Sequence, residues 1–105
     1  RADELLKVGG QWVAPVEVEE CLMRHEAVQL AAVIGIEHDG LTKTKAFVEL
    51  RAGFAPSVEL GVQLQDFVRG AIAKYKYPRL VEFVAELPKN DRGKVDKKAL
   101  RARES

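Results

Sequence analysis

The stretch VQLAAVIGIE, at residues 28–37, constrains the fold of this chain more than any other feature. It is rich in β-branched side chains and nearly continuous in apolar residues, a pattern typical of a strand buried inside a sheet. The next run, TKAFVELR at residues 44–51, alternates, so that Ala46, Val48 and Leu50 share one face. HDGLTK between the runs predicts a turn, and the two runs therefore predict consecutive strands.

Segments of helical periodicity stand on both sides of these strands. APVEVEECLMRHEAV, residues 14–28, predicts a helix that begins near Pro15, where acidic side chains in the first turns favour the helix dipole. VELGVQLQDFVRGAIAKY, residues 58–75, predicts a second helix capped at Pro56-Ser57. The inward stripe of this helix is expected to contain Leu60, Leu64, Phe67, Val68, Ala71 and Ile72. DKKALRAR predicts a short helix near the C-terminal end, capped by Asp96.

Further extended segments complete the predicted fold. ELLKV and QWVA, residues 4–8 and 11–14, are joined by Gly9-Gly10, and glycine adopts the positive φ of a tight hairpin turn without steric cost. RLVEFVAEL, residues 79–87, predicts a final strand. The sequence therefore predicts an α+β fold, a small domain with a β-hairpin and a three-stranded sheet packed against helices.

Composition bounds the class of protein. The chain has 105 residues, enough for one core, and 17 basic against 16 acidic residues leave a net charge of +1. This balance indicates neither nucleic acid nor an anionic membrane as a partner. One cysteine excludes an internal disulfide, and no apolar run resembles a membrane span or a signal peptide. We therefore expect a cytoplasmic protein, and the start at Arg1 is expected to mark a piece of a longer chain.

The residues alone indicate neither a metal site nor a nucleophile. His25 and His38 lie outside any metal-ligand spacing. Cys21 falls on an apolar helix face, where a buried structural thiol is expected. The Gly93-Lys94 pair does not complete a phosphate-binding loop, because the earlier glycine and the following Ser or Thr that such a loop needs are both missing.

An RNA-binding module is an alternative at this level. A sheet with helices on one face can offer a platform for RNA, and KTKAFVEL, residues 43–50, partly resembles the aromatic strand motif of RNA-recognition domains. Base stacking needs aromatic side chains at two exposed positions of that strand. Phe47 is present, but Lys45 and Leu50 replace the other aromatic residues of the motif. From these residues alone, Lys94 is interpreted as a solvated lysine at a helix entry.

Motifs at the two ends of the chain carry a family resemblance. RADELLKVGGQWVAPVEVE, residues 1–19, resembles the hinge and hairpin of the adenylate-forming superfamily, which comprises acyl-CoA and aryl-CoA synthetases, peptide-synthetase adenylation domains and beetle luciferases. LPKNDRGKVDKKAL, residues 87–100, resembles the last core motif, Pro-Lys-Thr-x-x-Gly-Lys-x-x-Arg/Lys, with Asn90 in place of threonine and Arg92 in place of the commoner serine. The likeness covers residues 1–105 as the mobile C-terminal domain of such an enzyme, and it is strongest to benzoate-CoA ligases.

The resemblance implies a two-step reaction. A carboxylate first attacks ATP to give an acyl adenylate and pyrophosphate, and the acyl group then passes to a thiol. Two anions must meet in the first step, and a positive charge placed between them offsets their repulsion. The resemblance assigns this role to Lys94, on a loop supported by Gly93. A flexible ammonium suits a group that must reach from one domain into another.

The resemblance assigns the second step to the other end of the chain. The domain is expected to rotate about a hinge at Asp3, which withdraws the lysine and brings the hairpin to the pantetheine tunnel of CoA. Gly9 and Gly10 allow backbone to approach that ligand closely. Trp12 is expected either to flank the tunnel or to pack the hairpin, and Arg69 is a candidate for the CoA 3′-phosphate. Three further cations predict either a rim for the nucleotide or a solvated surface: Lys74, Lys76 and Arg79.

Three functions follow as hypotheses. The first is the C-terminal domain of an aryl- or acyl-CoA ligase, inactive alone, whose ATP, Mg²⁺ and acid sites lie on an N-terminal domain. The second is an adenylation domain that serves a carrier-protein thiol, and the third is the RNA-binding module. Expected partners of the first are CoA, a small aromatic or aliphatic carboxylic acid, and a lysine acetyltransferase that reversibly neutralises Lys94. No metal ligand, nucleic acid or membrane is expected for this domain.

Overall fold

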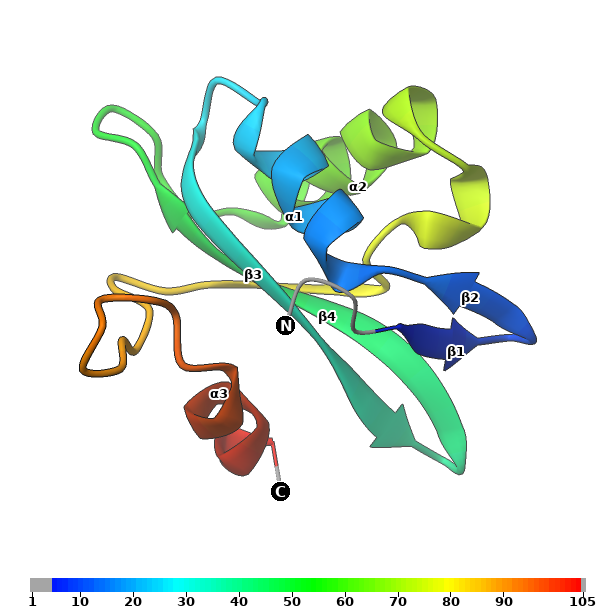
Figure 1. Ribbon diagram of the computed structural model, residues 1–105. Helices are drawn as coiled ribbons and strands as arrows, with labels where there is room; N and C mark the ends of the chain where they lie inside the picture. Colours follow the sequence, from blue (N-terminus) through cyan, green and yellow to red (C-terminus); the bar gives the residue numbers. More distant parts are fainter. Residues whose placement is uncertain (1–4, 105) are drawn as a thin grey trace.

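The computed structural model describes residues 5–104 and shows a three-stranded sheet with helices on both faces, beside a two-stranded hairpin (Figure 1). The elements are β1 (Leu6–Val8), β2 (Gln11–Val13), α1 (Pro15–Met23), β3 (Val28–His38), β4 (Leu41–Leu50), α2 (Val58–Ala71), a 3₁₀ turn η1 (Lys74–Lys76), β5 (Leu80–Phe83) and α3 (Lys97–Arg103). The sheet order is β3-β4-β5, with β3 antiparallel and β5 parallel to β4. The predicted α+β fold is confirmed.

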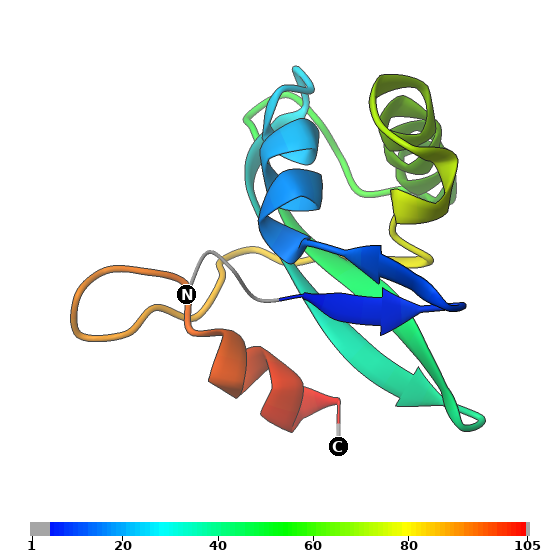
Figure 2. The ribbon, with the colours of Figure 1, turned by 45° about the vertical axis from the view of Figure 1, so that its right-hand side comes forward.

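Helices α1 and α2 cover one face of the sheet, and the larger core lies between these two layers (Figure 2). Ala46 and Val48 of β4 are fully buried there and Leu50 packs against them, as their alternation predicts. The other members of this core come from the hairpin, both helices and β3: Val8, Val13, Val18, Cys21, Leu22, Val28, Ala31, Val33, Leu64 and Val68.

The second face of the sheet is covered by α3 and the connection before it. Leu87 and Leu100 pack there against Ile34 and Phe47, and all four side chains are almost wholly buried. Strand β3 therefore sends alternate side chains into two different cores. This explains why residues 28–37 are apolar at nearly every position rather than at every second one.

The helix starts follow the predicted capping chemistry. Pro15 is the first residue of α1. Ser57 Oγ accepts a hydrogen bond from the backbone N–H of Leu60 at 3.0 Å, and Asp96 Oδ1 accepts one from Ala99 at 3.1 Å. Each cap satisfies one backbone donor that has no partner inside its helix. None of the described helices is long and apolar enough to cross a membrane.

The helix ends differ from the prediction. Helix α1 stops at Met23, because the following chain turns and the imidazole of His25 accepts a hydrogen bond from the backbone N–H of Ala27 at Nδ1, 3.1 Å away. Helix α2 stops at Ala71, whose side chain is exposed and does not join the inward stripe. Ile72 takes an extended conformation instead, and its side chain packs against the larger core.

The strand boundaries also differ. The turn between β3 and β4 consists of Asp39 and Gly40 alone, both at positive φ, so most of the segment predicted as a turn is strand. Strand β5 ends at Phe83 rather than at residue 87. The chain leaves the sheet there, and the backbone N–H of Leu87 donates to the Glu49 carboxylate at 2.7 Å as Leu87 enters the second core.

Candidate functional site

The loop that carries Lys94 is closed at its base. The backbone N–H of Asp96 donates to the carbonyl of Pro88 at 2.8 Å, and Lys89 and Val95 form an antiparallel bridge. One step further out, the N–H of Asn90 donates to the carbonyl of Lys94 at 2.8 Å. Residues 88–96 are therefore a short irregular hairpin rather than an open connection.

The tip of this loop needs a glycine. The N–H of Gly93 donates to the carbonyl of Asn90 at 2.9 Å, which closes a four-residue turn, and Gly93 has φ of 80°. Side chains disfavour this left-handed conformation, whereas glycine adopts it at little cost. The geometry gives a physical reason for the glycine that precedes the candidate catalytic lysine.

Lys94 is exposed at this tip. Within residues 5–104, no carboxylate forms an ion pair with its ammonium group. A turn fixed by backbone hydrogen bonds thus presents an unneutralised positive charge to the exterior. Such a group can act only on something that approaches from outside this domain.

Helix α3, which follows the loop, is held to the sheet by charged side chains. Lys45 lies 2.9 Å from both Glu82 and Glu104, and Arg103 lies 2.9 Å from Glu82. Burial alone would lower the pKa of Lys45, but the hydrogen bonds that Lys45 donates to Glu104 and Glu82 outweigh that effect and raise its pKa. The hydrogen bond from Lys45 is the main reason that the pKa of Glu82 is lowered. Sequence reasoning missed this network, because its members come from three separate elements.

The predicted glycine hairpin is present. Strands β1 and β2 pair with Val8 opposite Gln11, and Gly9 and Gly10 make the turn with φ of 57° and 82°. An added Cβ at either glycine would meet no atom within 4 Å, so the turn faces open space. Both glycines are required by backbone conformation, and the space beside them is free for a ligand.

Trp12 stands opposite Lys7 in this hairpin, and 57% of the tryptophan is exposed. The Lys7 ammonium lies 5.5 Å from the centroid of the ring, a cation–π contact. Trp12 therefore packs against the neighbouring strand on one side and leaves most of its surface outside every core.

The hairpin turn and the Lys94 loop project from opposite sides of the domain, as Figures 1 and 2 both show. The structure therefore does not bring the two predicted site regions together. Asp3, the predicted hinge, lies outside the described residues.

The candidate nucleotide-binding arginine has partners within the domain. The guanidinium of Arg69 lies 4.0 Å from the ring centroid of Tyr77 and pairs with Asp66. Tyr77, ahead of Asp66, raises the pKa of Arg69 above its ordinary value. Arg79 approaches the same ring to 4.8 Å. Two guanidinium groups are thus oriented by one aromatic ring.

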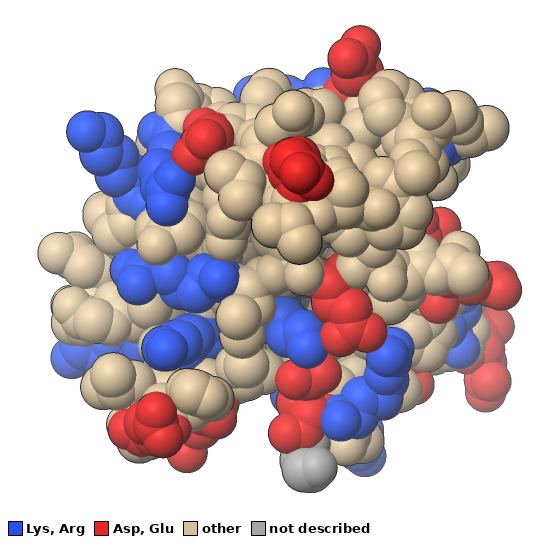
Figure 3. Space-filling view, turned by 180° about the vertical axis from the view of Figure 1, so that it is seen from behind, with Lys and Arg blue, Asp and Glu red and all other residues tan. Residues whose placement is uncertain are grey.

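The two lysines that were predicted to border the CoA nucleotide differ in their surroundings. Lys76 forms an ion pair with Glu17 at 2.6 Å, so its charge is already compensated, whereas Lys74 is exposed. On the rear face, Lys and Arg side chains gather along one side, while acidic and basic groups alternate over the lower part (Figure 3). The charge distribution of this face therefore favours local binding of an anion over a positive electrostatic potential that covers the whole face.

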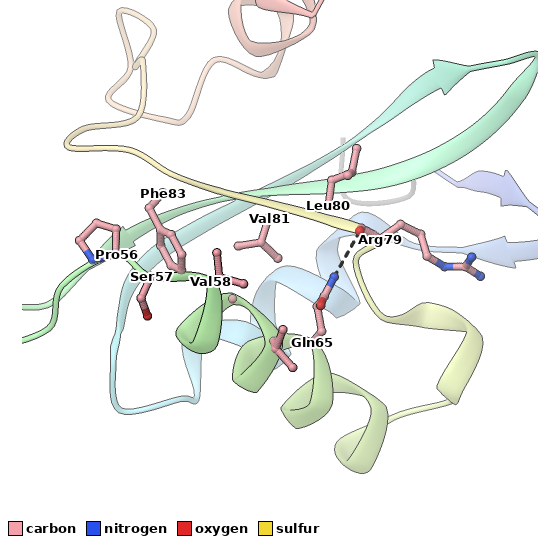
Figure 4. A pocket seen from close by; sticks show the side chains of 10 residues that line it. Pro56, Ser57, Val58, Gln65, Arg79, Leu80, Val81 and Phe83 are labelled. Carbon is pink, nitrogen blue, oxygen red and sulfur yellow. Dashed lines mark hydrogen bonds between the residues drawn. The ribbon is translucent and has the colours of Figure 1, made fainter.

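A groove of about 470 Å³ lies between α2 and β5 (Figure 4). Its walls are mainly apolar, and the amide of Gln65 crosses its floor to donate to the carbonyl of Arg79 at 3.2 Å. Arg79 at one end is the one lining residue that the sequence also marked as a candidate. The groove is separate from the lysine loop and from the glycine hairpin.

Two sequence-based alternatives can be judged from burial. Cys21 is fully buried, as predicted, and burial raises the pKa of its thiol. Phe47, the aromatic residue on which an RNA-binding surface would depend, is also fully buried. Because its ring packs in the second core, it cannot stack on a base.

Comparison of the sequence with known families identifies the family of this chain. Residues 17–94 match the family described as the AMP-binding enzyme C-terminal domain, and the chain belongs to this family. The match includes α1 from Glu17 onward, the whole three-stranded sheet, α2 and the loop as far as Lys94.

Individual relatives are CoA ligases. The chain is 47% identical over 103 residues to benzoate–CoA ligase of Thauera aromatica, covering 97% of this chain and 20% of the relative. It is 40% identical over 108 residues to the human mitochondrial acyl-coenzyme A synthetase ACSM1, covering all of this chain and 19% of the relative. The crystal structure of the anthranilate CoA ligase AuaEII in complex with anthranoyl-AMP superposes with a TM-score of 0.89 at 47% identity, covering 100% of this chain and 20% of that one. The chain thus spans about a fifth of the length of the relatives that it matches.

Proposed function

We propose that this chain is the C-terminal domain of an ATP-dependent, AMP-forming aryl-CoA ligase. The observation that carries the proposal is the placement of Lys94, which stands on a closed, exposed loop and whose ammonium has no ion-pair partner among residues 5–104. A lysine in this position serves a site completed by another domain. The proposed N-terminal domain supplies the ATP, Mg²⁺ and acid sites, and the domain alone is inactive.

An aromatic acid is the proposed substrate class. Support comes from relatives whose names specify benzoate and anthranilate, each 47% identical to this chain. A ligase for aliphatic acids is the competing proposal, because 4-hydroxybutyrate–CoA ligase 1 of Metallosphaera sedula is 39% identical to this chain.

In the proposed first step, Lys94 lies between the attacking carboxylate and the α-phosphate of ATP. Both reactants are anions, so the ammonium lowers the energy of the transition state in which they meet. Removal of one preorganised electrostatic group of this kind typically reduces the rate by about 10² to 10³. Acetylation of Lys94 would remove the same charge, and we propose it as a means of inactivation. The comparisons give no support for an acetyltransferase as a partner of this chain.

In the proposed second step, the domain rotates about Asp3 and presents its opposite side. Gly9 and Gly10 then line the path of the pantetheine arm, with the exposed ring of Trp12 beside it. Arg69 binds the 3′-phosphate of CoA, oriented by its stacking on Tyr77. The placement of the two turns on opposite sides of the domain supports this alternation, because one orientation cannot present both to one site.

The test is an acid and acceptor panel with the full-length parent enzyme. We expect pyrophosphate release with benzoate and its hydroxy and amino derivatives to exceed that with aliphatic acids, and thioester formation with free CoA. Faster turnover of aliphatic acids would contradict the aromatic class. Transfer to a carrier-protein thiol but not to CoA would identify the enzyme as a carrier-loading adenylation domain instead.

A further inference from the structure

The side chain of Asn90 holds together the loop that carries Lys94. Its Oδ1 accepts a hydrogen bond from the backbone N–H of Arg92 at 2.9 Å and a second from the backbone N–H of Lys94 at 3.2 Å. Asparagine commonly bonds to backbone groups two to four residues ahead in this way and stabilises tight turns. The sequence marked Asn90 only as a departure from threonine in the family motif.

The backbone of Asn90 closes the same turn. Its N–H donates to the carbonyl of Lys94 and its carbonyl accepts from the N–H of Gly93, at 2.8 and 2.9 Å. Both backbone groups of Lys94 are therefore bonded to Asn90, one to its main chain and one to its side chain. The direction in which the Lys94 side chain leaves the backbone is set by these two bonds.

We propose that Asn90 is a positioning residue for Lys94, an inference that rests on the proposed function. Lys94 acts across a domain boundary, so the position of its ammonium depends on how firmly this domain holds the lysine backbone. A fixed backbone lowers the entropy lost when the ammonium reaches the reacting phosphate. The exposed position of the loop makes the side-chain clamp necessary, since within residues 5–104 no core packing holds the tip.

Threonine can supply part of this clamp. Its hydroxyl oxygen also accepts hydrogen bonds from nearby backbone N–H groups, although it is one bond closer to the main chain than the amide oxygen of asparagine. Alanine provides no acceptor. Asn90→Thr is therefore expected to retain function that Asn90→Ala loses.

The experiment compares the two half-reactions in the full-length parent enzyme. Adenylation is followed as pyrophosphate release from ATP and benzoate, and thioester formation is followed with pre-formed benzoyl-AMP and CoA. The variants are Asn90→Ala, Asn90→Thr and Lys94→Ala. Asp91→Ala is the matched control, because it truncates a short polar side chain in the same turn that makes no hydrogen bond or ion pair within the described residues.

We expect Asn90→Ala to reduce kcat for adenylation roughly tenfold, with the KM for ATP and the thioester half-reaction unchanged. Asn90→Thr should recover most of that loss, and Asp91→Ala should remain near the wild-type rate. Equal losses in both half-reactions, or a threonine variant no better than alanine, would overturn the positioning role. If Lys94→Ala loses adenylation while Asn90→Ala keeps the full rate, the inference fails and the proposed function stands. If Lys94→Ala keeps the full rate, the proposed function itself fails.

Discussion

The carboxylate of Glu19 forms an ion pair with the ammonium of Lys97, and the same oxygen accepts the backbone N–H of Val33 at 2.8 Å. Glu19 lies on α1, directly after the hairpin, and Lys97 is the first residue of α3, directly after the Lys94 loop. Strand β3 is an edge strand, so the N–H of Val33 has no sheet partner to replace Glu19. One carboxylate therefore connects the two candidate site regions through the body of the domain.

Removal of this carboxylate is expected to destabilise the domain. Glu19→Ala leaves a buried N–H without an acceptor and a lysine without its partner, and the side chain of Glu19 is only 12% exposed. We expect the free energy of unfolding in urea to fall by about 2 kcal/mol. Glu20→Ala, which truncates the exposed neighbour, should cost less than about 0.5 kcal/mol. Similar losses of unfolding free energy in both variants would show that the contacts of Glu19 stabilise the domain no more than an exposed glutamate does.

The Lys45–Glu82 pair predicts an acid-sensitive stability. The pKa of Glu82 is held below the ordinary glutamate range by the hydrogen bond from Lys45. A lowered pKa in the folded state contributes stability above the unfolded-state pKa, and that contribution is lost as pH falls through the lower, folded value. Urea unfolding at about pH 6 and about pH 3 should therefore show a smaller loss of stability with acid in Glu82→Gln than in the wild type. An unchanged pH dependence in the variant would contradict the assignment.

The hairpin glycines allow a test of the second step with a matched turn. Gly10→Ala and Gly40→Ala both place a Cβ on a residue at positive φ, 82° and 76°, with nothing within 4 Å. Each should therefore cost roughly 1 kcal/mol of stability. In the full-length enzyme, Gly10→Ala is expected to slow thioester formation from acyl-AMP while Gly40→Ala does not. Equal rates in the two variants would leave the hairpin with a structural role alone.

The stacked arginine predicts a phosphate-specific effect. Arg69→Ala is expected to raise the KM for CoA roughly tenfold, since it removes a charge-assisted contact to the 3′-phosphate. The KM for 3′-dephospho-CoA should not change, because that substrate lacks the group. A parallel rise for both substrates would show that Arg69 supports the fold through Asp66 and Tyr77 rather than binding the nucleotide.

Local signals predicted most of the fold correctly. The glycine pair of the hairpin, the Ser57 and Asp96 caps and the alternation of β4 each depend on neighbouring residues, and each is present. The errors arose where tertiary packing overrode local preference. Ile72 has ordinary helical neighbours, yet its backbone is extended and its side chain packs against the larger core.

The candidate site was predictable only in part. Lys94 and Gly93 were found because they stand in a short motif. Glu19 and Lys97 are 78 positions apart, and the Lys45 network joins β4, β5 and α3, so no local pattern could show that these side chains meet. Asn90 was visible in the motif, but its two acceptor contacts depend on the turn that Gly93 permits.

The role of Lys94 is tested most directly by separate measurement of the two half-reactions in the full-length enzyme. Lys94→Ala should reduce pyrophosphate release from ATP and benzoate by about 10² to 10³ and leave thioester formation from pre-formed benzoyl-AMP close to the wild-type rate. Lys98→Ala, which removes an exposed lysine from the neighbouring helix, should affect neither. Acyl-AMP formation at the full rate without the Lys94 side chain would contradict the account.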